Sequence, residues 1–252
     1  MIYIAGAAVA APGSTRYQPV WVTRRGVATP IDTAWTVRLH VGACTCNGGF
    51  ALSPDGRRLA LVVARDSTNG DINIKQLDQV PFALTPLTFT GDNESPTWTA
   101  DGRAVAYSAG KGNDAPQTLV LRRRADGTGA VDTLLHPVRT RTITEVVSTR
   151  DTAKFILGLG INSLERDIVL ARRGDTTTTP LMADSTIVEI FPALSPDGRW
   201  LAYASNETGH LEVYVRSFPD VNAMRVPVSQ AGGIEPRWAH SGRELFFRNR
   251  TG

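Results

Sequence analysis

The sequence of 252 residues contains only two cysteines and four histidines, and it has no long apolar run. Two thiolates cannot fill the tetrahedral shell of zinc, and the histidines share no metal-ligand spacing, so we predict no metal site and no cofactor. We interpret Cys44 and Cys46, one residue apart, as incidental loop residues. No stretch approaches the roughly 18 apolar residues of a membrane span, so we expect no transmembrane segment in this chain.

Catalytic motifs are also missing. The chain has no Gly-x-Ser-x-Gly nucleophile elbow, no kinase catalytic loop and no Asp-Phe-Gly. The glycines of Gly158-Leu159-Gly160 complete neither the dinucleotide pattern nor the kinase glycine pattern. The apolar segment 1–12 lacks a basic leading segment and is too short for a signal peptide. We therefore expect a chain that is not itself an enzyme.

The charge is nearly balanced, with 27 basic and 24 acidic residues and a net charge of +3. The basic residues are scattered, except for the run Arg122-Arg123-Arg124. That run ends a predicted strand and precedes the turn Ala125-Asp126-Gly127, so we interpret it as a solvated turn rather than a nucleic-acid surface. We accordingly expect no nucleic-acid partner.

What the chain does contain is a repeat of the form Ser-Pro-Asp-Gly-Arg, followed by an alternating apolar strand. Full or near copies occupy residues 53–57, 99–103 and 195–199, and degenerate copies occupy 149–153 and 240–243. The residues at the turn position are separated by intervals of 46, 50, 46 and 44, and they are Gly56, Gly102, Thr152, Gly198 and Gly242. A period in the forties with several strands per unit is the signature of propeller blades.

The fourth unit shows the strands of a blade most clearly. Asp-Gly between two apolar runs supplies the positive φ angles of a tight hairpin turn. The expected strands are 191–194, 200–204, 211–216 and 224–228, and the strict alternation of 211–216 predicts a half-buried strand. Four antiparallel strands of this kind make one blade, and we find no convincing amphipathic helix of three turns in the chain.

We therefore predict an all-β fold, a single β-propeller domain over residues 1–252 with five to six blades of four antiparallel strands. A length of 252 residues is compatible with one domain of this class. The predicted divisions are a partial blade at 1–32, blades at about 33–90, 91–136, 137–183 and 184–229, and a partial blade at 230–252.

The two partial blades allow two explanations. The N-terminal strands could complete the last blade and close the ring, or the chain could be a fragment whose closing blade lies elsewhere. We favour the fragment, because the strand expected at Ile2 to Ala5 would duplicate one that the C-terminal segment already supplies. The propeller is thus expected to be incomplete at its C-terminus.

An acidic residue recurs seven to nine positions before the turn position in four units. Each precedes an entering strand, which is the innermost strand of a blade, so these carboxylates should gather at one mouth of the central channel. A ring of this kind would attract a cation or a basic peptide segment. The candidate ligand-binding residues are Glu94, Glu145, Glu189 and Glu235, and the first unit departs from the pattern with Gly48-Gly49-Phe50.

The repeats 193–203 and 96–102 resemble the WD40-like repeats of the TolB-type six-bladed propeller. This resemblance covers nearly the whole chain. Segments 211–219, 232–238 and 242–249 resemble more narrowly the propeller that follows the catalytic domain in many bacterial serine/threonine protein kinases. The third unit departs from the pattern, because it has lost the proline and the glycine of its turn.

The resemblance implies a binding or sensing module for a protein or peptide partner. It would be the sensor part of a receptor-type kinase or a TolB-like envelope scaffold, on the extracytoplasmic or periplasmic side of a bacterial envelope. Two alternatives stay open, namely the propeller that gates a prolyl-oligopeptidase-type hydrolase and a carbohydrate- or metal-binding propeller. These inferences rest on the family and not on the fold alone.

Overall fold

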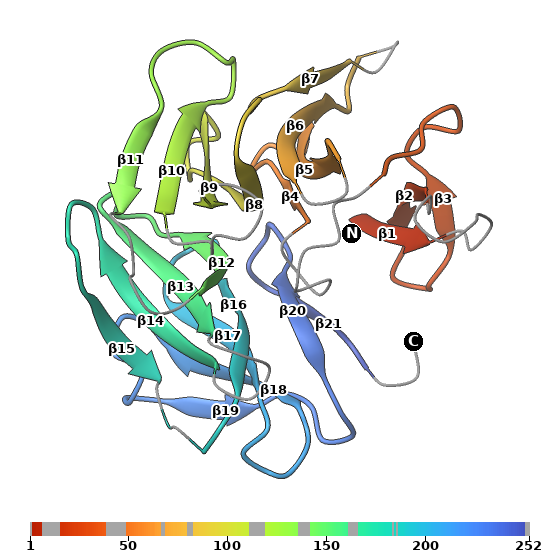
Figure 1. The fold of residues 1–252 in the computed structure, drawn as a ribbon. Coiled ribbons are helices and arrows are strands. Elements are labelled where there is room, and N and C mark those ends of the chain that lie inside the picture. Colours follow the sequence, from red (N-terminus) through yellow and green to blue (C-terminus); the bar gives the residue numbers. More distant parts are fainter. Residues whose placement is uncertain are drawn as a thin grey trace.

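The computed structural model describes residues 2–6, 16–38, 49–66, 69–79, 83–110, 119–135, 142–160, 166–182, 184 and 186–249. Within these ranges the chain consists of antiparallel strands and turns, with no helix. The sheets surround a common centre in the manner of propeller blades (Figure 1), which confirms the predicted fold class. In the described residues, no helix has both the length and the apolar character needed to span a membrane.

Four sheets are complete four-stranded blades. Blade 1 consists of β4 (Phe50–Leu52), β5 (Arg58–Ala64), β6 (Gly70–Gln76) and β7 (Leu84–Pro86). Blade 2 consists of β8 (Asp92–Trp98), β9 (Ala104–Gly110), β10 (Leu119–Arg124) and β11 (Asp132–Leu135). Blade 3 consists of β12 (Thr142–Ser148), β13 (Lys154–Gly160), β14 (Arg166–Arg172) and β15 (Thr178–Met182). Blade 4 consists of β16 (Glu189–Leu194), β17 (Trp200–Ser205), β18 (Glu212–Ser217) and β19 (Arg225–Pro227).

The two ends of the chain form smaller sheets. The N-terminal sheet has three strands, β1 (Ile2–Gly6), β2 (Tyr17–Val22) and β3 (Ala28–Pro30), and the C-terminal sheet is the hairpin of β20 (Ile234–Trp238) and β21 (Leu245–Arg248). The described strands of the two ends belong to separate sheets. Arg24 Nε donates a hydrogen bond of 2.8 Å to Glu244 Oε1, which connects one end sheet to the other.

The repeated turns are built as the sequence predicts. Gly56, Gly102, Gly198 and Gly242 all have φ between 67° and 73°, a region that glycine enters without steric cost. The turns also touch one another around one end of the channel. Arg58 Nη2 donates to the Gly102 carbonyl at 2.7 Å, and His240 Nδ1 lies 2.9 Å from the Pro54 carbonyl. The second contact joins residues 186 positions apart, so it connects the last hairpin to blade 1.

Blade 3 keeps its hairpin although Thr152 replaces the turn glycine. The carboxylate of Asp151 accepts a hydrogen bond from Ala153 N at 3.0 Å, and the Asp151 carbonyl accepts one from Lys154 N at 2.8 Å. An Asp side chain that bonds the backbone two residues on mimics a backbone turn. The strands β12 and β13 therefore pair as in the other blades.

Apolar clusters fill the spaces between consecutive sheets. One cluster joins blades 1 and 2 around Ile72, Trp98 and Tyr107, and another joins blades 3 and 4 around Ile156 and Tyr203. Burial on both faces explains an error in the prediction for 211–216. Instead of alternating, β18 is buried over its first three residues and half-buried over the rest, because neighbouring blades cover both of its faces.

Proline marks the outer edge of several sheets. Pro30, Pro86 and Pro227 lie on β3, β7 and β19, which are the outermost strands of their sheets. The residue after each proline donates its backbone N–H to the neighbouring strand, at 3.0, 2.7 and 2.8 Å respectively. Successive backbone N–H groups of a strand point to opposite sides, so the proline nitrogen lies on the side of the open edge. Proline on an edge strand removes a donor that could pair with another chain.

Candidate functional site

The four glutamates predicted at the channel lie on the innermost strands. Glu94 is on β8, Glu145 on β12, Glu189 on β16 and Glu235 on β20, and these strands pack against one another in sequence order. Glu94, Glu189 and Glu235 lie near the starts of their strands, at the end opposite the Asp-Gly turns, whereas Glu145 is the fourth residue of the seven-residue β12. The prediction that the glutamates precede the strands was wrong, because the inner strands begin earlier than expected.

The inner strands are irregular at this end because each contains a β-bulge. In β8, β16 and β20, two residues lie opposite a single residue of the next strand. The first of the two is Ser95 in β8, Phe191 in β16 and Glu235 in β20. These three have φ of 51°, 59° and 55°, and each is followed by proline. A bulge bends the strand and re-aims its side chains. The four glutamates consequently occupy different positions around the bulge, which explains the variable offset in the sequence.

Glu145 is enclosed by its own blade and by the last hairpin. The side chain is 5% exposed, and Thr144 Oγ1 donates to Glu145 Oε2 at 2.5 Å. A Cβ at Gly158 would lie 1.9 Å from Oε2, so this carboxylate requires glycine on the neighbouring strand. Burial lowers the pKa of Arg237, and the charges of Glu235 and Glu145 oppose that shift. A guanidinium group thus lies within electrostatic reach of two of the predicted mouth residues.

Glu235 and Glu94 are half-buried. Arg248 Nη2 lies 3.0 Å from Glu235 Oε1, so this second glutamate also has a basic neighbour within the hairpin of β20 and β21. The Glu94 backbone carbonyl accepts a hydrogen bond from Ser108 Oγ at 3.2 Å. The surroundings of Glu145 and Glu235 therefore include basic groups, Arg237 and Arg248, as well as acidic ones.

Glu189 has a different environment from the other three. It is 6% exposed, and its Oε2 accepts no hydrogen bond from the described residues. Burial and the charges of Asp167 and Asp184 raise the pKa of Glu189 to about 7, against the opposing charge of Arg216. The charges of two further acids, one on β14 and one after β15, therefore act on Glu189 where blade 3 meets blade 4.

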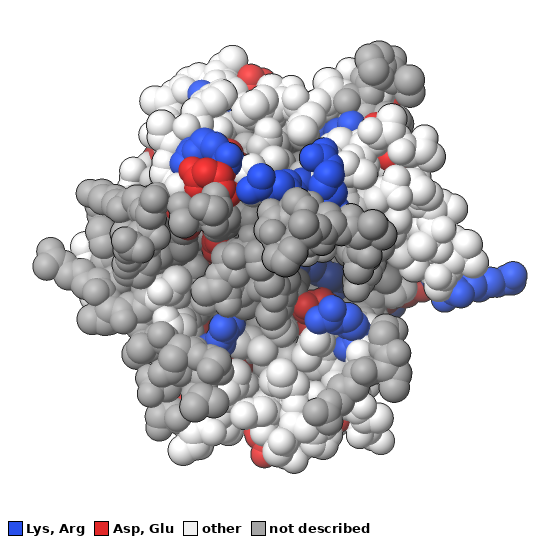
Figure 2. Space-filling model, turned by 45° about the vertical axis from the view of Figure 1, so that its right-hand side comes forward, with Lys and Arg blue, Asp and Glu red and all other residues white. Residues whose placement is uncertain are grey.

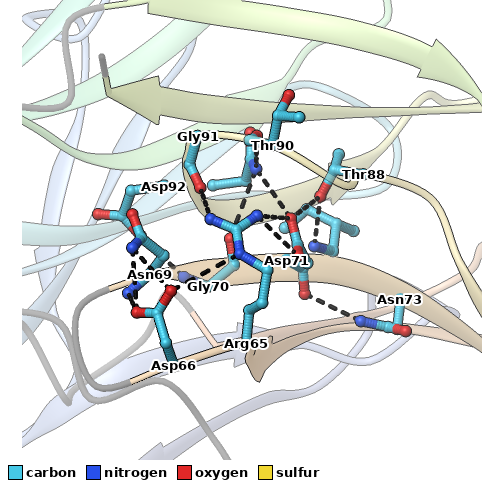
Figure 3. Close-up of polar contacts among 12 residues, drawn as sticks. Arg65, Asp66, Asn69, Gly70, Asp71, Asn73, Thr88, Thr90, Gly91 and Asp92 are labelled. Atoms are coloured by element: carbon cyan, nitrogen blue, oxygen red, sulfur yellow. Dashed lines mark hydrogen bonds and ion pairs between the residues drawn. The ribbon is translucent and has the colours of Figure 1, made fainter. Parts of the chain in front are cut away.

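A polar cluster with one central carboxylate joins blade 1 to blade 2 (Figure 3). Asp71, at the start of the third strand, accepts hydrogen bonds from Arg65 Nη1 at 3.1 and 3.0 Å and from Thr88 Oγ1 at 3.1 Å. Asn93 Nδ2, from the next blade, lies 3.4 Å from Asp71 Oδ1. Arg65 also donates to the Gly91 carbonyl at 2.7 Å. The buried acid is thus neutralised by a cation of its own blade.

The same arrangement recurs between blade 4 and the last hairpin. Glu212 is 3% exposed and accepts hydrogen bonds from Ser229 Oγ and, at 2.8 Å, from Gly232 N, while His210 Nε2 lies 2.6 Å from Glu212 Oε1. Burial opposes ionisation of Glu212, but the hydrogen bonds from Ser229, Gly232 and His210 together lower its pKa. Ser229 Oγ also accepts from Val213 N at 2.8 Å, as Thr88 Oγ1 does from Ile72 N.

These clusters were not predicted from the sequence. The signal was present, because an acid begins the third strand in Gly70-Asp71-Ile72 and Leu211-Glu212-Val213, and a hydroxyl follows 17 residues later in both. The proline that follows the positive-φ residue in β8, β16 and β20 was also visible in the sequence. Neither pattern reveals which side chains meet, because the partners come from different strands and different blades.

The three arginines of the basic run 122–124 all bind other groups of the protein. Arg122 pairs with Asp132 at 2.6 Å, Arg123 donates to two backbone carbonyls, and Arg124 pairs with Asp126 at 2.9 Å. On the face in Figure 2, basic and acidic side chains are interspersed with uncharged ones.

Within the described ranges, no group of three His, Cys, Asp or Glu side chains is placed to hold a metal ion. Cys44 and Cys46 lie outside those ranges.

Comparison with known proteins shows similarity at the level of the fold. No family model matches the chain, and no curated protein matches it. TolB from Acinetobacter baumannii is 18% identical with a TM-score of 0.60, over 89% of this chain and 54% of that one. A putative TolB from Agrobacterium tumefaciens is 15% identical with a TM-score of 0.65, over 93% of this chain and 85% of that one. The chain thus spans about half the length of the first and most of the second.

Two other similar structures carry different descriptions. A chain of a nidogen/laminin complex is 12% identical with a TM-score of 0.64, over 99% of this chain and 85% of that one. A prolyl endopeptidase is 12% identical with a TM-score of 0.54, over 92% of this chain and 37% of that one. All four identities are low, so the likeness establishes a TolB-like propeller fold and no activity.

Proposed function

We propose that this propeller is a non-catalytic module that binds a protein or peptide partner at the channel end where the inner strands begin. The observation that carries the proposal is that Glu94, Glu145, Glu189 and Glu235 all lie on innermost strands, which pack against one another in sequence order. A rigid sheet scaffold that presents loops and charged side chains around a channel suits recognition. A partner with basic side chains matches the acidic groups.

The wider context is part of the same proposal. The module belongs to a bacterial receptor-type serine/threonine kinase or to a TolB-like envelope scaffold, and it faces the extracytoplasmic side. The similarity to two TolB structures supports the scaffold context. The kinase context is supported by the sequence resemblance of segments 211–219, 232–238 and 242–249.

A peptide-selection experiment tests the binding function. A random peptide library is selected on the wild-type chain and counter-selected on the variant E94Q/E145Q/E189Q/E235Q. We expect enriched peptides to contain Lys or Arg and to bind the wild type about tenfold more tightly or better, since each charge-assisted hydrogen bond contributes roughly 1.5 to 3 kcal/mol. Circular dichroism and thermal unfolding verify that the variant is folded.

The chain offers a matched control. One exposed acid per blade lies in the turn between the third and fourth strands, at the opposite end of the propeller, and these are Asp78, Asp126, Asp175 and Asp220. The variant D78N/D126N/D175N/D220N changes the net charge equally and is expected to leave peptide binding intact. Equal binding by wild type and the glutamate variant, or no enrichment at all, contradicts the proposal.

A second candidate is the gating propeller of a prolyl-oligopeptidase-type hydrolase, which the similarity to a prolyl endopeptidase favours. The two contexts differ in what the natural coding region must contain. A kinase catalytic loop with Asp-Phe-Gly supports the sensor context, whereas a Gly-x-Ser-x-Gly elbow followed by Asp and His supports the gating context. Sequencing that region decides between them, and a region with neither motif contradicts the kinase and gating contexts and leaves the TolB-like scaffold.

A further inference from the structure

The junction between blade 4 and the last hairpin exposes apolar side chains at positions that the complete blades bury. The residue five positions after the turn position is 0 to 2% exposed in blades 1 to 4, where it is Leu61, Tyr107, Leu157 or Tyr203. The equivalent residue of the last hairpin is Phe247, which is 38% exposed. The second strand of the hairpin is therefore less covered at this position than the second strand of any complete blade.

The fourth strands show the same contrast. Val228 donates its backbone N–H to the Val213 carbonyl of the third strand at 2.8 Å. The residues that pair in this way with the third strands of blades 1, 2 and 3 are 1 to 6% exposed, and they are Leu87, Leu135 and Met182. Val228, in contrast, is 38% exposed. One apolar position on each side of this junction is thus accessible to solvent.

An apolar surface covers the side of blade 4 that faces the hairpin. A Cβ at Gly233 would lie 3.0 Å from Val213 Cγ2, so Val213 faces the hairpin. Residues two positions apart on a strand share a face, as do residues directly opposite each other on paired strands. By this register, the same face also contains Val215, Met224, Val226 and Val228.

Phe247 faces this surface from the hairpin. Trp238 Nε1 donates a hydrogen bond of 3.0 Å to the Ala193 carbonyl of blade 4, so Trp238 points toward blade 4. Its partner across the hairpin is Leu245, and Phe247 lies two positions further along the same strand. Leu245 and Phe247 therefore lie on the face of β21 that is turned toward blade 4.

The apolar surface of blade 4 extends further outward than that of the other blades. The residue equivalent to Val226 is polar in blades 1, 2 and 3, where it is Thr85, Asp132 and Thr179. Val226 is 44% exposed, and Met224, on the same face, is 49% exposed. The packing of one blade on the next does not require an apolar residue here. A contact that reaches beyond the usual blade interface explains both residues.

The hairpin keeps its place without a third strand. Ile234 packs against the buried Ile190 and Phe191 of blade 4. His240 Nδ1 lies 2.9 Å from the Pro54 carbonyl of blade 1. Among the described residues, β21 pairs with β20 alone, so its second edge has no strand partner there. The edge and the apolar surface beside it are therefore preformed, which lowers the cost of binding.

We infer that β21 and the outer half of blade 4 form a docking surface for a β-hairpin of a partner protein, whose first strand carries alternating aliphatic side chains. That strand adds to the open edge of β21 through main-chain hydrogen bonds, which is a common mode of peptide recognition. The surface is continuous with the packed interface between blade 4 and the last hairpin. It is separate from the four glutamates, so it goes beyond the binding function proposed above.

The complete blades indicate what the partner strand provides. In blade 2, Leu121 of the third strand lies opposite Tyr107 and packs against the cluster that joins blades 1 and 2. An aliphatic residue of the partner takes the equivalent place opposite Phe247 and covers Val228. The second strand of the partner hairpin then covers Val226, as fourth strands lie outside third strands in the complete blades.

The test uses a fluorescent peptide with the sequence of residues 119–135, which form the third and fourth strands of blade 2. Fluorescence anisotropy measures its binding to the wild-type chain. We expect F247D and V228D each to weaken binding about tenfold or more, because each replaces apolar burial with a desolvated charge. L84D is the matched control, since Leu84 is also 38% exposed and lies on the outermost strand of blade 1. Thermal unfolding verifies that each variant is folded.

Hydrogen exchange provides a second readout, which reports strand addition rather than adhesion to an apolar surface. We expect the peptide to slow amide exchange in residues 245–248 of the wild type. A peptide with Leu121→Asp is the control and is expected to leave exchange unchanged. Peptide binding without slower exchange at these residues overturns the addition of a strand to β21.

The remaining outcomes separate the possible occupants. Unchanged binding in F247D and V228D, or no binding to the wild type, overturns the docking surface and leaves the peptide selection on the glutamates unaffected. A dimer in sedimentation that F247D abolishes assigns the surface to a second copy and overturns the partner. Slow exchange at residues 245–248 in the product of the natural coding region, without peptide, also overturns it, because strands of the same polypeptide then cover β21.

Discussion

The junction between blades 1 and 2 and the junction between blades 3 and 4 place different charged groups around a buried acid. At the first, Arg65, Thr88 and Asn93 surround the Asp71 carboxylate with donors. At the second, the charges of Asp167 and Asp184 act on Glu189, and Glu189 Oε2 accepts no hydrogen bond from the described residues. Asp71 thus has a cation of its own blade as a partner, whereas burial and neighbouring acids favour the protonated form of Glu189.

A repeated backbone can therefore carry different charged groups at neighbouring junctions. Strand pairing and apolar burial are similar in both places, so the fold tolerates either set of side chains. A buried charge without a partner is costly, and binding sites are among the places where such a cost is found. Substitutions that alter one junction at a time test this contrast.

The largest effect is expected for E189Q. Because the pKa of Glu189 is raised from 4.5 to about 7 in the folded protein, the native state binds more protons than the unfolded state between these values. Stability contributed by this group is therefore present at low pH and is lost as the pH rises from about 4.5 to 7. We expect E189Q to raise the free energy of unfolding by on the order of 3 kcal/mol at pH 8 and little at pH 4.

Urea unfolding at pH 4 and pH 8 measures this difference. Other buried and paired carboxylates titrate in both proteins, so the difference between wild type and E189Q isolates the one group. An equal free energy of unfolding for the two proteins at pH 8 contradicts the raised pKa and, with it, the electrostatic contrast between the junctions.

The second effect concerns the complete junction. Arg65→Met keeps the aliphatic stem and removes the cation, which leaves Asp71 buried with fewer partners. Breaking a buried ion pair costs several kcal/mol, and the side chain of Arg65 is 34% exposed, so we expect a loss of about 2 to 3 kcal/mol at pH 7.

Arg124→Met is the matched control for Arg65→Met, since the ion pair of Arg124 with Asp126 is exposed on a turn. Exposed pairs contribute roughly 0 to 1 kcal/mol, so this variant should unfold close to wild type. Equal losses in the two variants, measured by urea unfolding, would show that Asp71 does not depend on its internal cation.

The smallest effect is expected at the third junction. Ser229→Ala removes a hydroxyl that accepts from Val213 N at 2.8 Å and donates to Glu212. Glu212 keeps Gly232 N and His210 as partners, so we expect a loss of about 1 to 2 kcal/mol. Ser241→Ala, in an exposed turn, is the control. A stability of Ser229→Ala equal to that of the control would argue against a shared architecture of the junctions.

Much of the fold was predictable because its signals are local. Asp-Gly turns at Gly56, Gly102, Gly198 and Gly242 were recognised from their sequence, and each adopts the expected positive φ. The turn without glycine at Thr152 was also placed correctly, since its flanking strands keep the apolar pattern. Strand 211–216 was misjudged because alternation assumes one solvated face, and both faces of β18 are covered.

The candidate site was predictable only in part. The sequence located four glutamates near the inner strands, and the structure places all four on those strands. Their different surroundings were beyond sequence reasoning, because Glu145 faces Gly158 across a strand pair and Glu189 meets Asp167 and Asp184 from another blade.

By itself, the sequence of this protein determined the repeat, the turns and the number of strands per blade. These depend on residues a few positions apart, where backbone preference and apolar period act directly. Only the tertiary structure decided which charged groups surround Asp71 and which surround Glu189. Electrostatic interactions depend on distance in space and on burial, and the packing of successive blades sets the charges that act on Glu189.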